Sequence, residues 1–270
     1  MWEGESTDHA AARGYAARIA SLGMIAVGLC GFSMAQARYP TLFPVVEVQH
    51  TFYEPPSATL PGRWRAAMPR DFEITIKAWQ LITHTAASPT YRRLKRVLTR
   101  DERAGAGGFR SSAIVDEAWR VTVEAATLVR ASAILFQCPA SFRPTGENLA
   151  AIRLFFARIE RPPGIRLMLE PRGPAWTSVL GRELCDELGA VHVVDPFVTA
   201  PIDRPGDEVR YFRLHGRGGA RHVYTDDELA ELAALAERPV SARTYVMFNN
   251  IPRVGDAQRF LARLRRVAGP

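Results

Sequence analysis

The sequence contains eight short apolar runs, rich in β-branched and aromatic residues, that recur along most of its length. They cover residues 24–32, 45–53, 72–80, 132–139, 165–172, 190–196, 209–216 and 244–250. Runs of this length are typical of strands that are buried on both faces, as strands of a parallel sheet are. Segments with helical spacing of apolar residues lie between several of the runs. The alternation predicts an α/β fold built on a parallel sheet.

The helical periodicity is clearest in four segments, residues 113–131, 145–159, 225–238 and 254–268. Thr145 is a candidate N-cap of the second segment, and Thr225 with Glu228 forms a candidate capping box for the third. We expect the glycine-rich residues 103–110 to form a loop between the third strand and its helix. Eight strands in one chain predict a single TIM-type (β/α)8 barrel, with a doubly wound open sheet as the alternative.

The length of the chain agrees with one domain. It has 270 residues, 47% of them hydrophobic, and α/β barrels of this size form a single core. We expect the barrel domain to cover residues 24–270, behind an extension at residues 1–23. The apolar run at 22–32, followed by "AQA" at 35–37, also resembles a signal peptide. The run contains three glycines and is too short to span a membrane.

The formal charge is +7, and arginine supplies nearly all of the basic residues, since Lys77 and Lys95 are the only lysines. A basic balance permits binding of nucleic acid or acidic metabolites but does not bear on the fold. A GC-rich genome also explains an excess of arginine. Cys30, Cys138 and Cys185 are far apart in the sequence, so we expect reduced, buried thiols in a cytoplasmic protein. We expect no association with a membrane.

Charged and amide residues collect at the carboxyl ends of the predicted strands, where barrel enzymes carry their active sites. The residues expected to line this mouth are Glu47, Lys77, His84, Gln137, Glu170, Arg172, Asp195, Arg213, His215, Asn249 and Asn250. Glu47, Gln49, Thr51 and Tyr53 alternate along the second strand and are expected to share one face. A charge inside an apolar strand is costly unless it is paired. The pattern therefore predicts either a ligand pocket or a closed salt-bridge network that plugs the mouth.

In a ligand pocket, each residue type has a chemical role. Glu47, Glu170 or Asp195 acts as general acid or base, and His215 carries protons. Lys77, Arg172 and Arg213 bind an anionic group. The remaining side chains, which contribute polar contacts to the substrate, are His84, Gln137, Asn249 and Asn250. A hydrolase, a lyase or an isomerase of a polar substrate is compatible with this set.

Motifs for cofactors do not occur in the sequence. It contains no Walker A motif, GxGxxG, GxSxG or HExxH. Two carboxylates and two histidines could ligate a divalent ion, but arginine and lysine at the same level oppose a cation. We therefore expect no metal site, and the sequence implies no particular cofactor. The stretch "GRGG" at 216–219 is a candidate phosphate-binding turn after the seventh strand.

The motifs at these strand ends resemble the YecE-like family, domain of unknown function 72. The matching stretches are "VGLCGF" (27–32), "VEVQHTFYEPP" (46–56), "FEITIKAWQLITH" (72–84), "ILFQCPASF" (134–142), "LEPRGPAW" (169–176), "VVDP" (193–196), "YFRLHG" (211–216) and "YVMFNN" (245–250). The resemblance implies a (β/α)8 barrel and a retained first strand at 24–32, with Met24 as a candidate start.

The resemblance also places nine residues on polar positions that the family shares: Glu47, Lys77, His84, Glu170, Arg172, Asp195, Arg213, His215 and Asn249. The chain departs from the family pattern at Gln49, where asparagine is common, and at Gly173, where a histidine often follows the arginine. A mechanism that needs that histidine would not operate here.

The resemblance implies no reaction, and three functions stay open. The first is an enzyme that acts on a small polar or anionic substrate. The second is a barrel that binds or processes nucleic acid, which arginines clustered at the mouth would favour and arginines scattered over the helices would oppose. The third is a non-catalytic ligand-binding or interaction barrel. No feature of the sequence sets an oligomeric state.

Overall fold

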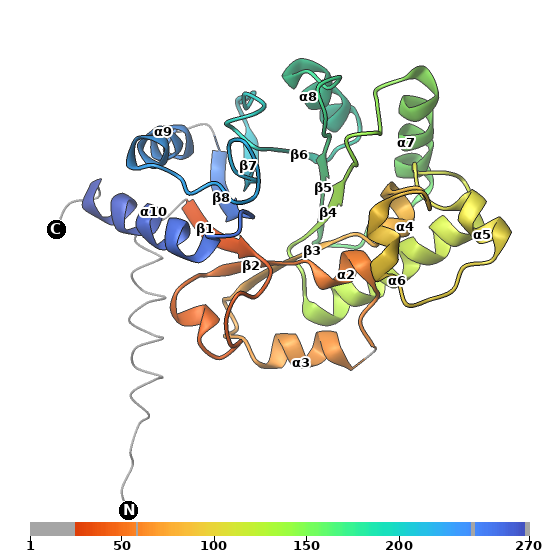
Figure 1. Cartoon of the computed structure of the whole chain (residues 1–270), viewed down its shortest axis with the longest axis horizontal. Coiled ribbons are helices and arrows are strands. Elements are labelled where there is room, and N and C mark those ends of the chain that lie inside the picture. The colour runs from red at the N-terminus through yellow and green to blue at the C-terminus, as the bar shows by residue number, and fades with distance from the viewer. Residues whose placement is uncertain (1–24, 58, 239–240, 268–270) are drawn as a thin grey trace, which may run out of the picture.

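The computed structural model describes residues 25–57, 59–238 and 241–267. Eight parallel strands form a closed barrel in sequence order (Figure 1). They are β1 (Ile25–Cys30), β2 (Val45–Val48), β3 (Glu73–Lys77), β4 (Ala133–Gln137), β5 (Arg166–Glu170), β6 (Val191–Val194), β7 (Asp207–Leu214) and β8 (Ser241–Phe248). Because β1 pairs with both β2 and β8, the sheet has no free edge. The predicted (β/α)8 barrel is confirmed, and the predicted extension at 1–23 lies outside the described residues.

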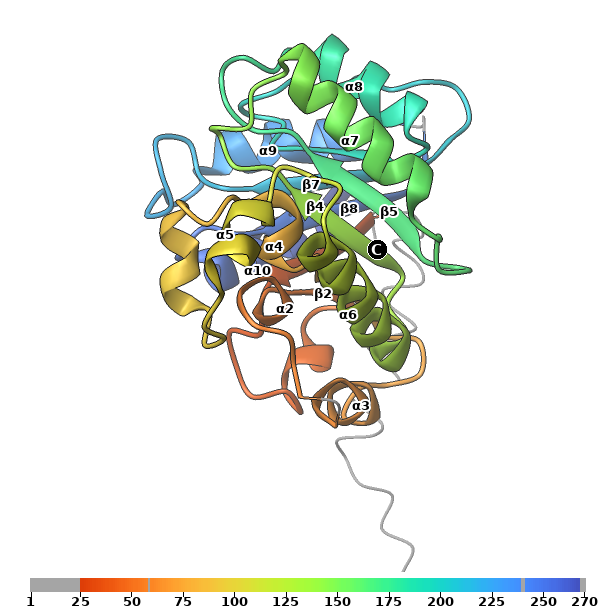
Figure 2. The same ribbon diagram turned by 90° about the vertical axis from the view of Figure 1, so that its right-hand side faces the viewer.

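Helices surround the barrel on its outer side (Figures 1 and 2). The longer ones are α3 (Leu60–Ala66), α6 (Ala113–Val129), α7 (Gly146–Arg158), α8 (Ser178–Glu187), α9 (Asp226–Ala236) and α10 (Arg253–Val267). Short helical segments follow some strands: η1 (Tyr39–Thr41), α2 (His50–Tyr53), α4 (Gln80–Thr83), η2 (Pro89–Arg93) and α5 (Arg100–Gly105). Residues 195–206, between β6 and β7, contain no helix. No helix in the described part of the chain is long and apolar enough to cross a bilayer.

The expected helix caps are present. The Thr145 hydroxyl accepts a hydrogen bond from the Asn148 amide at the start of α7. Thr225 and Glu228 form a complete capping box on α9, in which each side chain bonds the backbone of the other residue. These bonds satisfy amides that a helix leaves unpaired in its first turn.

The core has an inner and an outer part, because every strand of a closed parallel barrel is buried on both faces. The inner part lies within the barrel and includes Val45, Leu135, Met168, Tyr211 and Met247. The outer part lies between the strands and the helices, where aromatic side chains of β4, α6 and α7 pack on one another: Trp119, Phe136, Phe155 and Phe156. These two faces account for the unbroken apolar runs in the sequence.

The second and third strands are shorter than predicted. β2 ends at Val48 and α2 follows it, so the expectation that Thr51 and Tyr53 share a strand face with Glu47 is wrong. The chain turns there because the Thr51 hydroxyl donates to the Lys77 carbonyl oxygen at 2.7 Å, which ties α2 to the end of β3. The alternating side chains of residues 49–53 imitate a strand in the sequence but belong to a helical turn.

Candidate active site

Arg213 is the centre of a charged cluster inside the barrel, at the carboxyl ends of the strands. Its side chain is fully buried and forms ion pairs with two carboxylates. Its Nη2 donates to Glu47 Oε1 at 2.8 Å, and its Nη1 donates to Glu170 Oε2. The two acids lie on β2 and β5, and Arg213 lies on β7. Together the strands bring a guanidinium between carboxylates that are far apart in the sequence.

Glu47 is fully buried in this cluster, and both of its carboxylate oxygens accept hydrogen bonds. Besides Arg213, it accepts hydrogen bonds from the Tyr211 hydroxyl at 3.0 Å and from the Gln49 amide. The Tyr211 oxygen lies 3.0 Å from the Thr75 hydroxyl and accepts its hydrogen bond, because the tyrosine proton points to the carboxylate. Glu47 has no exposed surface. These contacts favour an orienting role for Glu47 over the predicted role as acid or base.

Glu170 and His215 form a hydrogen-bonded pair in the same cluster. The Nε2 atom of His215 lies 2.7 Å from Glu170 Oε1, and its Nδ1 lies 3.1 Å from the Asn249 amide nitrogen. A carboxylate only accepts and an NH2 group only donates, so Nε2 carries the proton and Nδ1 has the lone pair. Burial tends to raise the pKa of Glu170, but Arg213 and His215 outweigh it and hold that pKa below its ordinary value.

Asp195 fixes the backbone beside this pair. Its carboxylate accepts hydrogen bonds from the backbone amides of His215 at 2.8 Å and Phe197 at 3.1 Å. Burial raises the pKa of Asp195, and the bond from the His215 amide partly opposes that effect. Because both of its oxygens are bound to backbone, Asp195 positions the end of β7 and the loop after β6.

Lys77 lies on the β3 side of the mouth and has few polar contacts. Its side chain is 4% exposed, and Nζ donates to Gln137 Oε1 at 2.6 Å. The ammonium also lies 3.8 Å from the centre of the Phe52 ring. Burial, helped by the charge of Arg213, lowers the pKa of Lys77 to about 7. A buried amine of this kind is a candidate functional group.

His84 lies next to Lys77, at the end of α4. Its ring contacts Phe52 edge-on, with ring centres 4.9 Å apart, and its Nδ1 shares a 2.7 Å hydrogen bond with the Thr83 hydroxyl. Burial, with the nearby charges of Lys77 and Arg172, lowers the pKa of His84 to about 3. The imidazole is therefore neutral at physiological pH.

Arg172 follows β5 and is the most accessible charge of the cluster. Its side chain is 42% exposed, and its Nε lies 3.8 Å from Glu170 Oε1. Asn250, in contrast, does not join the other predicted residues at the mouth. It is fully buried and donates to Asp256 Oδ2 of α10 at 2.6 Å and to the His222 carbonyl oxygen at 2.9 Å. Asn250 therefore connects the loop after β7 with the start of α10, away from the charged cluster.

Two members of the cluster were not among the sequence candidates. Tyr211 bonds Glu47, and the Cys30 sulfur lies 3.7 Å from Arg213 Nη2. Burial, followed by the charge of Glu47, raises the pKa of the Cys30 thiol well above its ordinary value. The signal for Tyr211 was its parity with Arg213 and His215 on one strand. Cys30 ends the first strand, in the position where other strands carry charged residues.

The cluster holds no obvious metal-binding set. Within residues 25–57, 59–238 and 241–267, no three side chains of histidine, cysteine, aspartate or glutamate are grouped to hold a metal ion. The reason is visible at Arg213, whose guanidinium occupies the space between Glu47 and Glu170.

The loop after β7 uses its backbone amides internally. The Gly216 amide donates to the Tyr224 hydroxyl at 2.9 Å, and the Gly219 amide donates to the Gly216 carbonyl oxygen at 3.1 Å. Gly216 has a φ of +93°, which glycine adopts without strain. These bonds make "GRGG" a closed turn and leave it fewer amides for the phosphate that the sequence suggested.

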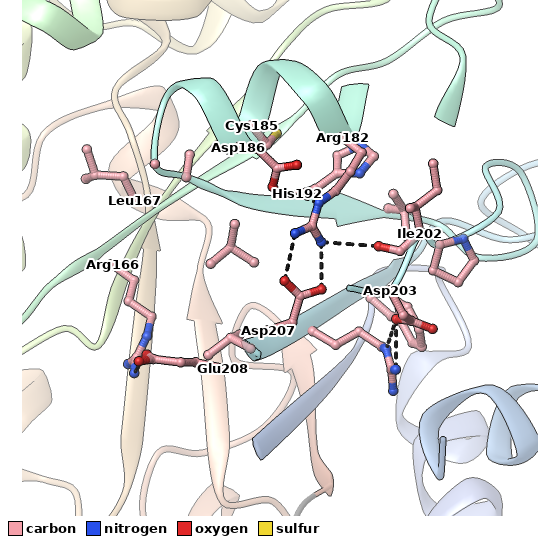
Figure 3. A pocket seen from close by; sticks show the side chains of 18 of the residues that line it. Arg166, Leu167, Arg182, Cys185, Asp186, His192, Ile202, Asp203, Asp207 and Glu208 are labelled. Carbon is pink, nitrogen blue, oxygen red and sulfur yellow. Dashed lines mark hydrogen bonds and ion pairs between the residues drawn. The ribbon is translucent and has the colours of Figure 1, made fainter. Parts of the chain in front are cut away.

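A cavity of about 410 Å³ lies at the opposite end of the barrel, near the amino ends of β5 to β7 (Figure 3). Arg182 of α8 reaches into it and binds both carboxylate oxygens of Asp207 at 2.7 Å, as well as the Ile202 carbonyl oxygen. His192 also lines the cavity. Residues at this end of a TIM barrel serve stability, whereas catalytic residues lie at the other end, so we place the candidate site at the mouth despite the size of the cavity.

Comparison with known proteins gives a consistent result for the fold. Residues 35–270 match the family described as protein of unknown function DUF72. A DUF72 family protein from Enterococcus faecalis V583 is 23% identical, with a TM-score of 0.65 over 92% of this chain and 98% of that one. Another from Thermotoga maritima MSB8 is 20% identical, with a TM-score of 0.62 over 90% and 99%.

A more distant structural similarity concerns a barrel of another family. The structure of a D-psicose 3-epimerase, in the presence of D-fructose, is 12% identical, with a TM-score of 0.52 over 91% of this chain and 100% of that one. At this identity the similarity concerns the fold alone. No curated protein matches the chain.

Proposed function

The chain belongs to the DUF72 family, and from this premise we propose that its barrel mouth binds a small polar substrate with an anionic group and transfers protons on it. The observation that carries the proposal is the pair formed by Glu170 and His215. A buried carboxylate that accepts the proton-bearing nitrogen of an imidazole leaves the lone pair of the other nitrogen to act as a base, once the substrate takes the place of the Asn249 amide. The hydrolase, lyase and isomerase classes all use such a step.

In the proposed reaction, His215 accepts a proton from the substrate on Nδ1. The imidazolium that forms stays bound to Glu170 through Nε2, and the negative charge of Glu170 stabilises it. The lowered pKa of Glu170 keeps this carboxylate ionised, so it does not take the proton itself. The Asn249 amide, which now donates to Nδ1, occupies the place where a substrate C–H or O–H would approach.

The anionic group is bound by Arg172, which approaches the same Glu170 oxygen as His215, and by Lys77. Both lie close enough to His84 to affect its pKa, which supports a shared basic region. Arg213 has a different part, because its charge is already neutralised by Glu47 and Glu170. Arg172 is half-exposed and its nearest carboxylate oxygen is 3.8 Å away, so its guanidinium is available for a carboxylate or phosphate.

The first test is binding. We expect calorimetry with a panel of C2–C6 carboxylates and sugar phosphates to give at least one ligand, and Arg172→Ala to weaken its binding about 10-fold or more, as loss of a charge-assisted hydrogen bond does. The control is Arg153→Ala, in an exposed ion pair on α7, which should leave binding unchanged. If no anion binds, the charged cluster is a plug and the proposal fails.

The second test is proton transfer. The bound ligand is incubated in D2O, and NMR follows deuterium incorporation into it. His215→Gln should keep the ligand affinity within a few-fold and slow the exchange by about 10²–10⁴, the usual contribution of a general base. Binding without any exchange in the unaltered protein would identify a non-catalytic ligand-binding barrel.

The nucleic-acid alternative receives less support from the positions of the arginines. Many of them lie on the outer helices or at the amino ends of the strands, and they pair there with carboxylates. Examples are Arg153 and Arg158 on α7, Arg182 on α8 and Arg259 on α10. Scattered, paired arginines do not form the continuous basic surface that phosphate backbones require.

A further inference from the structure

We propose that Lys77 forms a covalent imine with its substrate, which makes the substrate class small carbonyl compounds that bear an anionic group. The inference rests on the proposed function, because it places the same substrate at the same mouth. It replaces the binding role of Lys77 with a covalent one and leaves the anionic group to Arg172.

The first support is the choice of lysine at this position. The chain has 35 lysines and arginines, and only Lys77 and Lys95 are lysines. Lys95 is exposed, whereas Lys77 is buried at the mouth. Where the barrel needs only a buried positive charge, it uses Arg213. Arginine keeps its proton at every physiological pH, and lysine does not, so an amine at position 77 supplies a reactivity that a guanidinium lacks.

The second support is the set of contacts around the amine. Among the described residues, Lys77 has no carboxylate within the 4.0 Å of an ion pair. The neighbouring acids, Glu47 and Glu170, are both taken up by Arg213. A buried lysine with a purely structural role needs a carboxylate partner to offset the loss of hydration. Lys77 instead has a neutral amide and an aromatic face, which leave its nitrogen free to lose a proton.

The protonation of Lys77 agrees with these contacts. With a pKa of about 7, about half of the Lys77 amines carry a lone pair at pH 7, against fewer than about 1 in 1,000 for an exposed lysine of pKa about 10.4. Only the neutral amine attacks a carbonyl carbon, and desolvation in a hydrophobic pocket is an established way to obtain it.

The covalent step balances without any further reactant. The nitrogen lone pair of Lys77 forms a C–N bond with the carbonyl carbon, and the C=O π electrons move to oxygen, which takes up a proton. The resulting carbinolamine loses its hydroxyl group, with one more proton, as water, and the nitrogen gives up its hydrogens to leave a C=N bond. When protonated, this imine acidifies the neighbouring C–H, and His215 is the group that removes that proton.

The experiment is reductive trapping on the full chain. The protein is treated with glyoxylate and sodium cyanoborohydride at pH 7, and peptide mass spectrometry measures carboxymethylation of Lys77 and Lys95 in the same molecules. We expect Lys77 to react about 10-fold faster or more, although it is the buried one, because its neutral fraction is far larger. Lys95→Arg should leave this rate unchanged, and Arg172→Ala should reduce it. Equal or faster labelling of Lys95 would overturn the imine.

The test remains valid even if Lys77→Arg does not fold. It compares the labelling rates of Lys77 and Lys95 in the unaltered chain, so it needs no variant of Lys77. The outcome is also separable from the proposed function. If an anion binds in an Arg172-dependent way and exchanges protons, but Lys77 is not labelled preferentially, the imine is wrong and the acid–base proposal stands. If no anion binds and Lys77 is unreactive, both are wrong.

Discussion

Among single residues, Arg213 has the largest expected effect on stability. Its guanidinium is the cation for two buried carboxylates, so Arg213→Met leaves Glu47 and Glu170 without their partner. Breaking a buried pair from one side costs about 3–5 kcal/mol. We expect urea unfolding to show a loss in that range.

The matched control is Arg153→Met, which removes an ion pair between half-exposed side chains on α7 and α8. Exposed pairs contribute about 1 kcal/mol or less. A similar loss for both variants would mean that the charges at the mouth are hydrated and not buried.

The partners of these residues were less predictable than their positions. Parity along each strand and the barrel topology predicted that Glu47, Glu170 and Arg213 would lie at one level. Their pairing depends on how β2, β5 and β7 are placed around the closed barrel, across 166 residues for Arg213 and Glu47. Local patterns do not carry that information. Local patterns also did not predict that the Asn250 side chain would turn away from the mouth toward Asp256. Asn249 and Asn250 are adjacent residues of the same type, so the sequence does not show which of the two side chains points into the mouth.

Among the elements, the loop that supports α4 contains a glycine that the site needs. Gly107 has a φ of +77°, and a Cβ there would lie 2.2 Å from the carbonyl group of His84. Its amide donates to the Leu81 carbonyl oxygen at 2.7 Å. Gly107→Ala should therefore cost about 2–4 kcal/mol, through backbone strain and displacement of the segment that holds His84.

Gly255→Ala in α10 is the matched control for this change. A Cβ at Gly255 meets nothing within 4 Å, so alanine should stabilise the helix by about 0.5–1 kcal/mol. Thermal unfolding of both variants distinguishes the two effects. A neutral Gly107→Ala would show that the loop adapts without moving α4.

The same elements explain where sequence patterns were insufficient. The helices α6, α7, α9 and α10 and all eight strands follow from apolar periodicity, which burial imposes directly. α2 and α4 each have four residues, too few to show a helical period, and their apolar residues continue the pattern of the preceding strand. Contacts with other parts of the chain decide their form, such as the bond from Thr51 to Lys77.

At the level of the whole molecule, buried groups set how stability depends on pH. Unfolding returns the pKa of Lys77 from about 7 to about 10.4. Between these values the unfolded chain binds more protons, so stability rises with pH. Burial raises the pKa values of the Cys30, Cys138 and Cys185 thiols. Unfolded thiols ionise from about pH 8.5, so stability falls above that pH and should be greatest near pH 8.

Below pH 7, stability depends on His84, which is buried, and on His192, which is partly buried. Burial lowers the pKa of His84 to about 3 and that of His192 to about 4. Their contribution to the free energy of unfolding is therefore complete above pH 6.5, and it is lost as the pH falls toward these pKa values. Urea unfolding from pH 5 to 9 should show the maximum. Lys77→Met should remove about 1.6 kcal/mol of the rise in stability between pH 7 and 8.5. If stability rises with pH by the same amount in Lys77→Met, a group other than Lys77 causes the rise.

The position of Arg213 also bears on how the barrel folds. Glu47 belongs to the first half of the chain, and its cation belongs to β7. A half-barrel that ended after β4 would bury the carboxylate of Glu47 without the guanidinium that pairs with it, since Lys77 of β3 forms no ion pair with Glu47 among the described residues. Such a fragment would gain little stability by folding without the second half of the chain. We therefore expect closure of the sheet and neutralisation of its interior to occur in one cooperative event, without two independently stable halves.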